Sequence, residues 1–140
     1  MLPQEAEGLL AQANHAILAI NRPSGAPHVT PVWYLWDGQA FYISTATDRA
    51  KYTHIVHDPA VALIVEDPGS SNYVAAYGRA EIIERADPAF EDLTRRVIGK
   101  YLPPDKAGKM LEIALSPQRV VIKLRPERVV VGGKAVALTA

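Results

Sequence analysis

The chain has 140 residues, a length typical of a single domain with a substantial buried core. Fifteen basic and fifteen acidic residues cancel, so no overall field draws the chain to nucleic acid or to an anionic membrane. The absence of cysteine excludes disulfides, thiolate metal sites and cysteine nucleophiles. The N-terminal segment is acidic, unlike a signal peptide, and no apolar run approaches about 18 residues. We therefore expect one cytoplasmic domain over residues 1–140, without nucleic-acid or membrane partners.

The first third of the chain predicts one helix followed by strands. Residues 3–13 indicate a short helix with Pro3 in its first turn. Residues 15–45 then predict three strands in series. A turn at residues 23–25 joins the first two strands, and the Asp-Gly pair at residues 37–38, which tolerates positive φ, joins the second and third. This arrangement predicts a β-meander.

The next predicted helix, residues 49–57, has an unusual charge at its start. Asp48 is placed to cap it, and an Asp-Pro pair at residues 58–59 ends it. Arg49 and Lys51 stand in its first turn, where free N–H groups already carry partial positive charge and acids are preferred. Two cations there favour a bound anion, although a solvated helix face is the commoner fate of such charges. The apolar side of this helix is predicted to hold Tyr52, Ile55 and Val56.

Two strands and a long helix follow. Residues 60–67 and 72–84 predict strands, and Gly78 in the second indicates a bulge or a close backbone approach. The clearest helix has Asp87 as its cap and Pro88 as its first residue, and it ends before the next proline pair. Its predicted buried positions follow helical spacing: Phe90, Leu93, Thr94, Val97, Ile98 and Tyr101.

The last elements complete a mainly β fold. Residues 106–114 predict another helix, and residues 119–131 predict a pair of strands with the only proline of that segment at a kink. About six strands with inserted helices, and no regular alternation of strand and helix, predict an antiparallel barrel of the α+β class.

Common catalytic motifs are missing from the sequence. It contains no glycine-rich phosphate loop, no nucleophile elbow and no zinc-binding H-E-x-x-H. His54 and His57 could share a helix face, but no carboxylate is placed as a third ligand, so we expect no metal site. His15 and His28 are interpreted as polar strand residues.

The stretch "HVTPVWYLWDGQAFYISTATDRAKYTHIVHDPAVALIVED" resembles the split-barrel family of flavin and deazaflavin oxidoreductases, whose founding activity is pyridoxamine phosphate oxidation. The resemblance extends to the later segments "YGRAEII" and "RVVIKLRPERV", and it is strongest to the branch that uses the deazaflavin coenzyme F-420. It implies a six-stranded antiparallel split β-barrel with short helices. It also implies a C2 homodimer, because the family builds its cofactor cleft between two barrels.

The resemblance implies roles for particular residues. Lys51 matches the family's phosphate-binding lysine and Arg49 the basic residue just before it, while Ser44 and Thr45 match a strand end that reaches the same anion. Residues 30–33 match the strand along which the tricyclic ring lies: Thr30, Pro31, Val32 and Trp33. Trp33 and Tyr34 point to opposite faces of a strand, so only one of them can line the site. Trp36 is expected in the core or in a dimer contact.

A later strand of the resemblance is also expected near the site. It carries Tyr77 and Arg79, which are equally acceptable as ordinary barrel residues.

One departure from the family pattern concerns the choice of cofactor. Oxidases that hold FMN tightly place an arginine where this chain has Thr30. Loss of a bidentate phosphate ligand removes a contact worth about 1.5–3 kcal/mol. The resemblance therefore favours a deazaflavin, whose longer acidic tail would extend over the basic segment, and disfavours FMN.

The function implied is reduction of a small organic molecule by hydride transfer from coenzyme F-420. No protein acid or base is obligatory, and either Tyr77 or a water is a candidate proton donor. The alternatives are an FMN-dependent oxidase or reductase, a non-catalytic flavin- or heme-binding protein, and a structural protein without an anion site.

Overall fold

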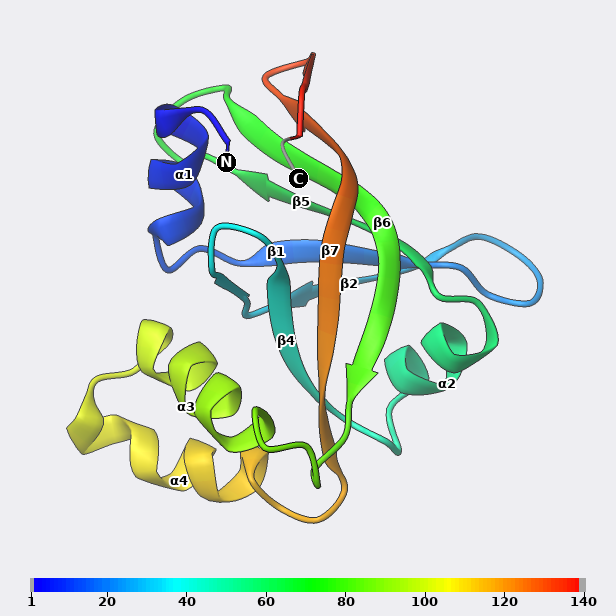
Figure 1. The fold of residues 1–140 in the computed structure, drawn as a ribbon, viewed down its shortest axis with the longest axis vertical. Coiled ribbons are helices and arrows are strands. Elements are labelled where there is room, and N and C mark those ends of the chain that lie inside the picture. Colours follow the sequence, from blue (N-terminus) through cyan, green and yellow to red (C-terminus); the bar gives the residue numbers. More distant parts are fainter. Residues whose placement is uncertain (1, 139–140) are drawn as a thin grey trace.

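The computed structural model describes residues 2–138, which form four helices and a single curled antiparallel sheet (Figure 1). The helices are α1 (Gln4–Ala11), α2 (Ala50–His57), α3 (Phe90–Tyr101) and α4 (Pro104–Ala114). The strands are β1 (Ala16–Ile20), β2 (His28–Val32), β3 (Leu35–Trp36), β4 (Phe41–Ala46), β5 (Ala60–Glu66), β6 (Tyr73–Ile83), β7 (Arg119–Val131) and β8 (Lys134–Val136). Within residues 2–138, no helix is both long enough and apolar enough to cross a membrane.

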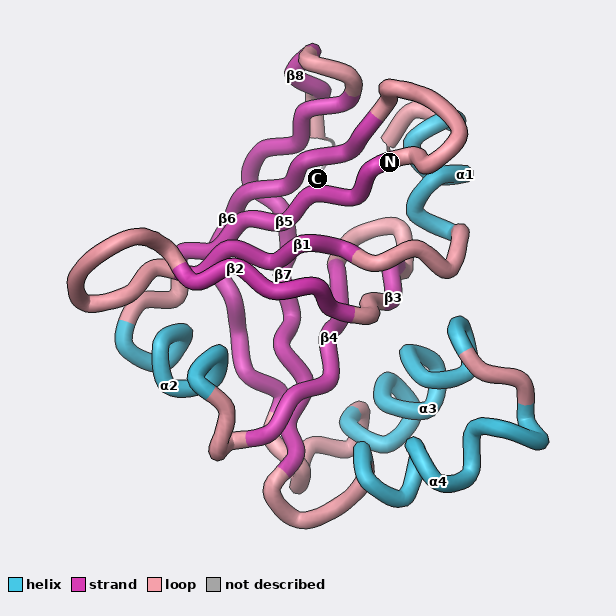
Figure 2. The backbone as a smooth tube through the Cα atoms, turned by 180° about the vertical axis from the view of Figure 1, so that it is seen from behind, coloured by secondary structure: helices cyan, strands magenta, loops and turns pink. Residues whose placement is uncertain are grey.

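The order of the strands shows how the barrel closes. It runs β2-β1-β5-β6-β7-β4-β3, with β8 added to β7. β2 and β3 lie at opposite ends of this order, yet only Trp33 and Tyr34 separate them along the chain. The sheet must therefore curl until its two ends meet, as the tube in Figure 2 shows. We call the Trp33–Tyr34 segment the seam.

This closure confirms the predicted split barrel and corrects two details. The sheet has eight strands, where about six were expected; the second predicted strand is interrupted at the seam, and β8 is an additional strand. Both hairpins of the predicted β-meander are present, β1 with β2 and β3 with β4 across the Asp-Gly turn at residues 37–38. The middle strand is not continuous, because β2 and β3 lie at opposite ends of the sheet order.

Alternation along β4 separates two apolar layers. Phe41 and Ile43 are buried in the main core of the barrel, whereas Tyr42 packs in a second cluster with α3. The buried side of α3 confirms most of the predicted positions: Phe90, Leu93, Thr94, Val97 and Ile98. The α3–α4 hairpin therefore covers the outside of β4, and α2 lies on the other side of the sheet end (Figure 1).

β7 is one strand of 13 residues and not the predicted pair of strands. It pairs with β4 over its first half and with β6 along most of its length. Its proline, Pro126, lies opposite Gly78, where the register with β6 shifts between Tyr77 and Gly78. This irregularity accommodates a residue without an N–H donor inside a sheet. The bulge expected at Gly78 is thus confirmed.

The starts of two helices differ from the prediction. Arg49 is the N-cap of α2 and no side chain caps this helix, so the predicted cap at Asp48 is wrong. Val56 is 61% exposed, whereas Ile55 is buried, so the predicted apolar side of this helix is wrong at Val56. α3 begins at Phe90, and Asp87 accepts a hydrogen bond from the N–H of Ala89 in the preceding turn.

Lys100, near the end of α3, anchors the seam. Its Nζ donates hydrogen bonds to the carbonyls of Leu10 at 2.9 Å and Tyr34 at 3.1 Å, and it lies 3.5 Å from the centroid of the Tyr34 ring. The Tyr34 hydroxyl donates to the same Leu10 carbonyl at 3.1 Å. Because Lys100 belongs to α3, Leu10 to α1 and Tyr34 to the seam, these bonds join the three segments. Both accepting residues are fully buried.

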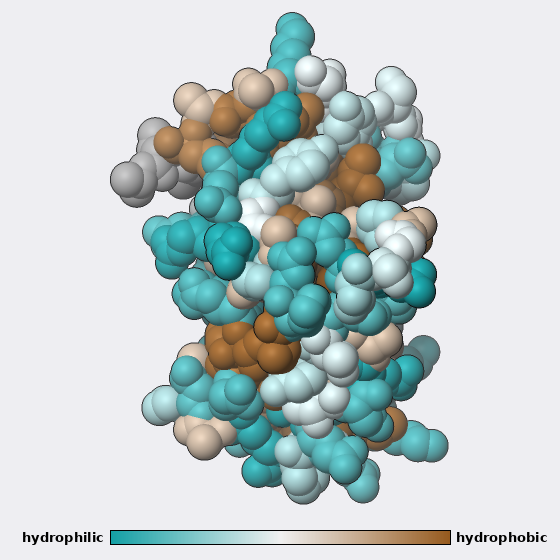
Figure 3. Space-filling model, turned by 90° about the vertical axis from the view of Figure 1, so that its right-hand side faces the viewer, coloured by the Kyte–Doolittle hydropathy of each residue, from teal (hydrophilic) through white to brown (hydrophobic). Residues whose placement is uncertain are grey.

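The surface is not uniform. The face on the right of Figure 1 is mostly hydrophilic, with hydrophobic side chains gathered in a few patches (Figure 3). Elsewhere the outer side of the β1, β2 and β5 strands carries large exposed apolar residues: Ile17, Val29 and Ile64. This outer sheet face has no covering layer within residues 2–138.

Candidate functional site

A cavity of about 210 Å³ opens where the seam meets the helices, and we call it the seam cavity. Its apolar wall consists of Pro31, Val32, Trp33, Val97, Ile98 and Met110. Its polar wall consists of Ser44, Lys51 and Arg119. Five of the ten predicted site residues therefore come together here: Pro31, Val32, Trp33, Ser44 and Lys51.

The strands explain why the polar wall forms. Ser44 follows Ile43 in β4, so its side chain points away from the barrel core and toward the helices. Arg119 begins β7, which pairs with β4, and its Nη2 donates to the Ser44 hydroxyl at 2.8 Å. The Nε of Arg119 is buried and has no hydrogen-bond partner. One guanidinium donor is thus left without an acceptor in the chain.

Positive charge at this wall is not neutralised. Burial lowers the pKa of Lys51 from its ordinary value, and the neighbouring charges of Arg49 and Arg119 lower it further. Burial and Arg49 also lower the pKa of Arg119, while Asp48 opposes this shift. The two ion pairs found in residues 2–138 both lie on α3, away from this cluster. The three cations therefore repel one another and favour an anion.

Trp33 forms a flat side of the apolar wall. Its ring stacks on that of Tyr101 with centroids 4.6 Å apart and planes 3° from parallel. Tyr34 is fully buried on the opposite side, which confirms that only one of the two aromatic residues lines the cavity. Trp36 packs against Phe41 in the core, and its Nε1 donates to Glu7 at 2.9 Å.

Three other predicted residues lie near the cavity without lining it. Thr45 is 3% exposed and alternates with Ser44, so its side chain points to the barrel side of β4. Thr30 lies on β2 next to Pro31. Arg49 is exposed at the start of α2, yet it is close enough to influence the pKa of both Lys51 and Arg119.

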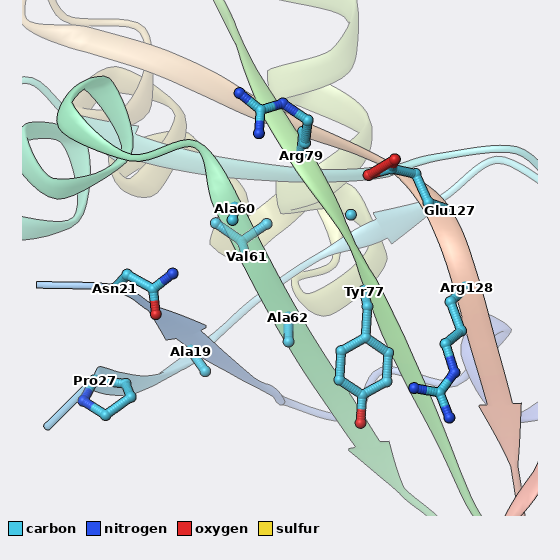
Figure 4. Close-up of a pocket in the computed structure, with 11 residues that line it drawn as sticks. Ala19, Asn21, Pro27, Ala60, Val61, Ala62, Tyr77, Arg79, Glu127 and Arg128 are labelled. Atoms are coloured by element: carbon cyan, nitrogen blue, oxygen red, sulfur yellow. The ribbon is translucent and has the colours of Figure 1, made fainter.

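Tyr77 and Arg79 lie at a different cavity of about 530 Å³ on the outer face of the sheet (Figure 4). Small side chains of β1 and β5 contribute to it, among them Ala19 and Ala62. The Tyr77 ring lies beside Arg128, whose Cζ is 5.4 Å from the ring centroid. The predicted site is therefore divided between two cavities of one chain.

Sequence analysis missed Arg119, which completes the cation cluster. The arginine is visible in the sequence at the start of a predicted strand, but it lies 75 residues from Ser44. No local pattern reports which strands pair over such a distance. The only available signal was a basic residue at the start of a predicted strand, with no acidic residue placed to pair with it.

The histidines do not form a metal site in the part of the chain that the structure describes. The rings of His28 and His54 are 6.0 Å apart between centroids. Among residues 2–138, no three histidine, aspartate or glutamate side chains come together in a way that could hold an ion.

Comparison with known proteins identifies the family. The family model for pyridoxamine 5'-phosphate oxidase matches residues 2–131. The chain belongs to this pyridoxamine 5'-phosphate oxidase family. The resemblance found in the sequence is thus confirmed, and with it membership of a family of flavin-binding oxidoreductases.

The solved structures that match this chain include one above 30% sequence identity. An F-420 reductase is 32% identical, with a TM-score of 0.72 over 92% of this chain and 98% of its own. A conserved hypothetical protein of Mycobacterium tuberculosis is 23% identical, with a TM-score of 0.79 over 100% of this chain and 92% of its own. General Stress Protein 26 of Bacillus anthracis is 17% identical, with a TM-score of 0.72 over 96% and 97%. The last two show the fold alone. A comparison with curated proteins finds no match.

The seam cavity fits the cofactor class of the pyridoxamine 5'-phosphate oxidase family. A flavin combines a flat apolar ring with an anionic group, and the cavity combines the Trp33 wall with two lining cations, Lys51 and Arg119, and with Arg49 nearby. The guanidinium of Arg119 lines the cavity without an ion-pair partner in residues 2–138, so it can donate to a phosphate oxygen there. The donor set therefore suits an anion attached to an aromatic body.

Proposed function

We propose that this protein is an oxidoreductase that binds the deazaflavin coenzyme F-420 and reduces a small organic molecule. The observation that carries the proposal is the cluster of Arg49, Lys51 and Arg119 beside the apolar wall of the seam cavity. The 32% identity to an F-420 reductase supports the choice of deazaflavin over other flavins.

The residues of the site have distinct roles in this proposal. Lys51, Ser44 and Arg49 hold the acidic groups of the cofactor, and Pro31, Val32 and Trp33 orient its ring. When bound, a reduced deazaflavin would supply a hydride, and a proton from water, or from Tyr77 of a second copy of the chain, would complete the reduction of the substrate. The protein contributes orientation and exclusion of water, which the apolar wall and the α3–α4 hairpin provide at the seam.

FMN is the second candidate cofactor, because the family includes pyridoxamine 5'-phosphate oxidases and the cation cluster suits a phosphate. Titration of the purified protein with each cofactor, followed by cofactor fluorescence, discriminates the two. Tighter binding of F-420 supports the proposal, and binding of FMN alone contradicts it. Binding of either cofactor without hydride transfer to any of a panel of electron acceptors would indicate a non-catalytic binding protein.

Replacement of Lys51 by alanine is expected to weaken F-420 binding by about 2 kcal/mol, since it removes a charged hydrogen-bond donor from the polar wall. The free energy of unfolding should change little, because relief of the repulsion by Arg49 and Arg119 offsets the lost packing. Fluorescence titration at low salt measures the affinity, and urea unfolding measures the stability.

Arg95→Ala is the matched control for this prediction. Arg95 pairs with Glu91 on the exposed side of α3 and is not part of the cavity wall. Its loss should leave F-420 binding unchanged. Added salt should weaken binding to the wild type more than to the Lys51 variant, because one cation is already gone. Equal affinities of the wild type and Lys51→Ala at low salt would remove Lys51 from the site.

The exposed side of the sheet supports the homodimer that the family resemblance implies. The strand registers align two apolar rows across this outer sheet face. One row contains Val29, Ala19, Ala62 and Tyr77, and the other contains Pro31, Ile17, Ile64 and Ala75. Such a continuous apolar face is typical of an interface. A C2 dimer through this face would bring Tyr77 and Arg79 of a second copy toward the cofactor cleft.

Ile17→Glu is expected to convert the dimer into a monomer, since it places a charge in the middle of one apolar row. Ile17 is 42% exposed, so the single chain should tolerate the change. Ile113→Glu is the control, because Ile113 is 47% exposed on α4 and lies outside these rows. Sedimentation velocity at dilute concentration measures the result. A folded wild-type monomer as the main species would contradict the dimer.

A further inference from the structure

We propose that Arg119 binds the cofactor's phosphate from β7, in place of the arginine that the family resemblance leads us to expect at the position of Thr30. This inference rests on the proposed function, because it adds a residue to the same site. It also changes the interpretation of position 30. The presence of threonine there no longer discriminates, by itself, between FMN and F-420 as the cofactor.

The contacts of Arg119 are those of a ligand-binding residue rather than a structural one. A structural arginine usually pairs with a carboxylate, but no ion pair involves Arg119 within residues 2–138. Its one hydrogen bond to a side chain is to the Ser44 hydroxyl at 2.8 Å, and its Nε is buried without an acceptor. The buried Nε adds an unsatisfied donor to the folded chain, and the guanidinium lines the seam cavity without a carboxylate partner, so it is free to bind an anion that enters the cavity.

The surroundings of Arg119 point to a phosphate as that ligand. Lys51 lines the same cavity, and Arg49 stands near enough to disfavour charge on both. Asp48 raises the pKa of Arg119 through its charge, but the two side chains do not form an ion pair. A guanidinium presents its donors as a planar fork that matches two oxygens of a phosphate, whereas lysine acts as a point charge. Together Arg119, Lys51 and Arg49 form a clamp around one anionic group, which we call the anion clamp.

The order of the strands explains how Arg119 can take the place of an arginine at position 30. Thr30 lies on β2, at one end of the sheet order, whereas Arg119 lies on β7 beside β4, near the other end. The seam brings these two ends together at the cavity. A residue from β7 and a residue from β2 can therefore line the same cavity, as Arg119 and Pro31 do.

The test compares the wild type with Arg119→Met, Arg119→Lys and the control Arg125→Met. Arg125 is exposed on the same strand and does not line the seam cavity. Each protein is titrated with F-420 and with FMN by cofactor fluorescence. Thermal unfolding is also recorded with increasing inorganic phosphate, and with acetate as a weakly bound comparison. Phosphate binding reports on the anion clamp without any need for cofactor or turnover.

We expect Arg119→Met to weaken binding of each cofactor that the wild type binds at least 10-fold, with Arg119→Lys intermediate and Arg125→Met unchanged. Phosphate should raise the Tm of the wild type and not that of Arg119→Met. Without ligand, Arg119→Met should unfold at the same Tm or higher, because repulsion and an unsatisfied donor are removed. A merely structural arginine would instead lower the Tm.

The outcomes separate this inference from the proposed function. If both cofactors bind the wild type and Arg119→Met equally, Arg119 is not a ligand, while the proposed function stands. If neither cofactor binds the wild type but phosphate raises its Tm through Arg119, the anion clamp stands and the proposed function fails. If phosphate raises the Tm of both proteins equally, the clamp does not include Arg119. If Arg119→Met does not fold, the same comparisons are made with Arg119→Lys.

Discussion

Replacement of Lys100 by methionine is expected to lower the free energy of unfolding by about 3 kcal/mol, since hydrogen bonds from a charged donor to buried acceptors are each worth about 1.5–3 kcal/mol. Methionine keeps the apolar stem but removes the bonds to the carbonyls of Leu10 and Tyr34. It also removes a cation 3.5 Å from the centroid of the Tyr34 ring. After the change, the Leu10 carbonyl retains the Tyr34 hydroxyl at 3.1 Å, and the Tyr34 carbonyl retains only the longer hydrogen bond from the Tyr101 hydroxyl at 3.4 Å.

Lys109→Met is the matched control, because Lys109 is exposed on the neighbouring helix α4. Its replacement should change the free energy of unfolding by less than about 0.5 kcal/mol, as is usual for surface positions. Urea unfolding of both variants at one protein concentration makes the comparison. Equal stabilities of the two variants would show that Lys100 does not anchor the seam.

Replacement of Gly78 by alanine is expected to destabilise the fold by about 3 kcal/mol, at the upper end of what overpacking costs in a rigid interior. A Cβ at this position would lie 2.8 Å from the carbonyl oxygen of Arg125 and 3.3 Å from the N of Glu127. Both contacts are with the backbone of β7, which cannot move without disturbing the bulge opposite Tyr77.

Gly99→Ala provides a control of opposite sign. Gly99 is exposed inside α3, and a Cβ there would meet no atom within 4 Å. Alanine should therefore stabilise the protein by about 0.5–1 kcal/mol, because glycine is a poor helix former. Thermal or urea unfolding measures both variants. Similar effects of the two substitutions would mean that close strand approach at Gly78 is not what requires glycine.

Local sequence patterns predicted most of the elements because these patterns reflect each element's own geometry. The spacing of Phe90, Leu93 and Val97 reports one buried helix face, and the structure places all three against the barrel. Gly78 was predicted as a close approach because glycine inside a strand has few other uses. The β4 strand and the Asp-Gly turn before it were likewise local features.

The features that the sequence could not predict depend on contacts between distant segments. At the break between β2 and β3, Tyr34 is buried and its carbonyl accepts a hydrogen bond from Lys100. Lys100 lies 66 positions further along the chain than Tyr34. The helix starts were also misplaced. Asp48 and Asp87 are favourable caps by composition, but the turns that precede α2 and α3 use other geometry.

The candidate site shows the same division. The residues around the seam and the start of α2 could be assigned by resemblance, because they lie within one stretch of the chain. Arg119 could not be assigned, because only the pairing of β7 with β4 brings it to Ser44. Tyr77 and Arg79 were assigned to the same site, whereas within one chain they line the outer cavity.

The distance along the chain between Ser44 and Arg119 has a consequence for folding kinetics. The two residues are 75 positions apart, so the anion clamp forms only when β7 docks on β4 and closes a long loop. Contacts across such long loops form slowly, because the entropy of the loop is lost before the contacts can compensate for it. Docking also brings three cations together. A cofactor held by this clamp therefore cannot template the early strands, and it captures only chains whose barrel is already closed.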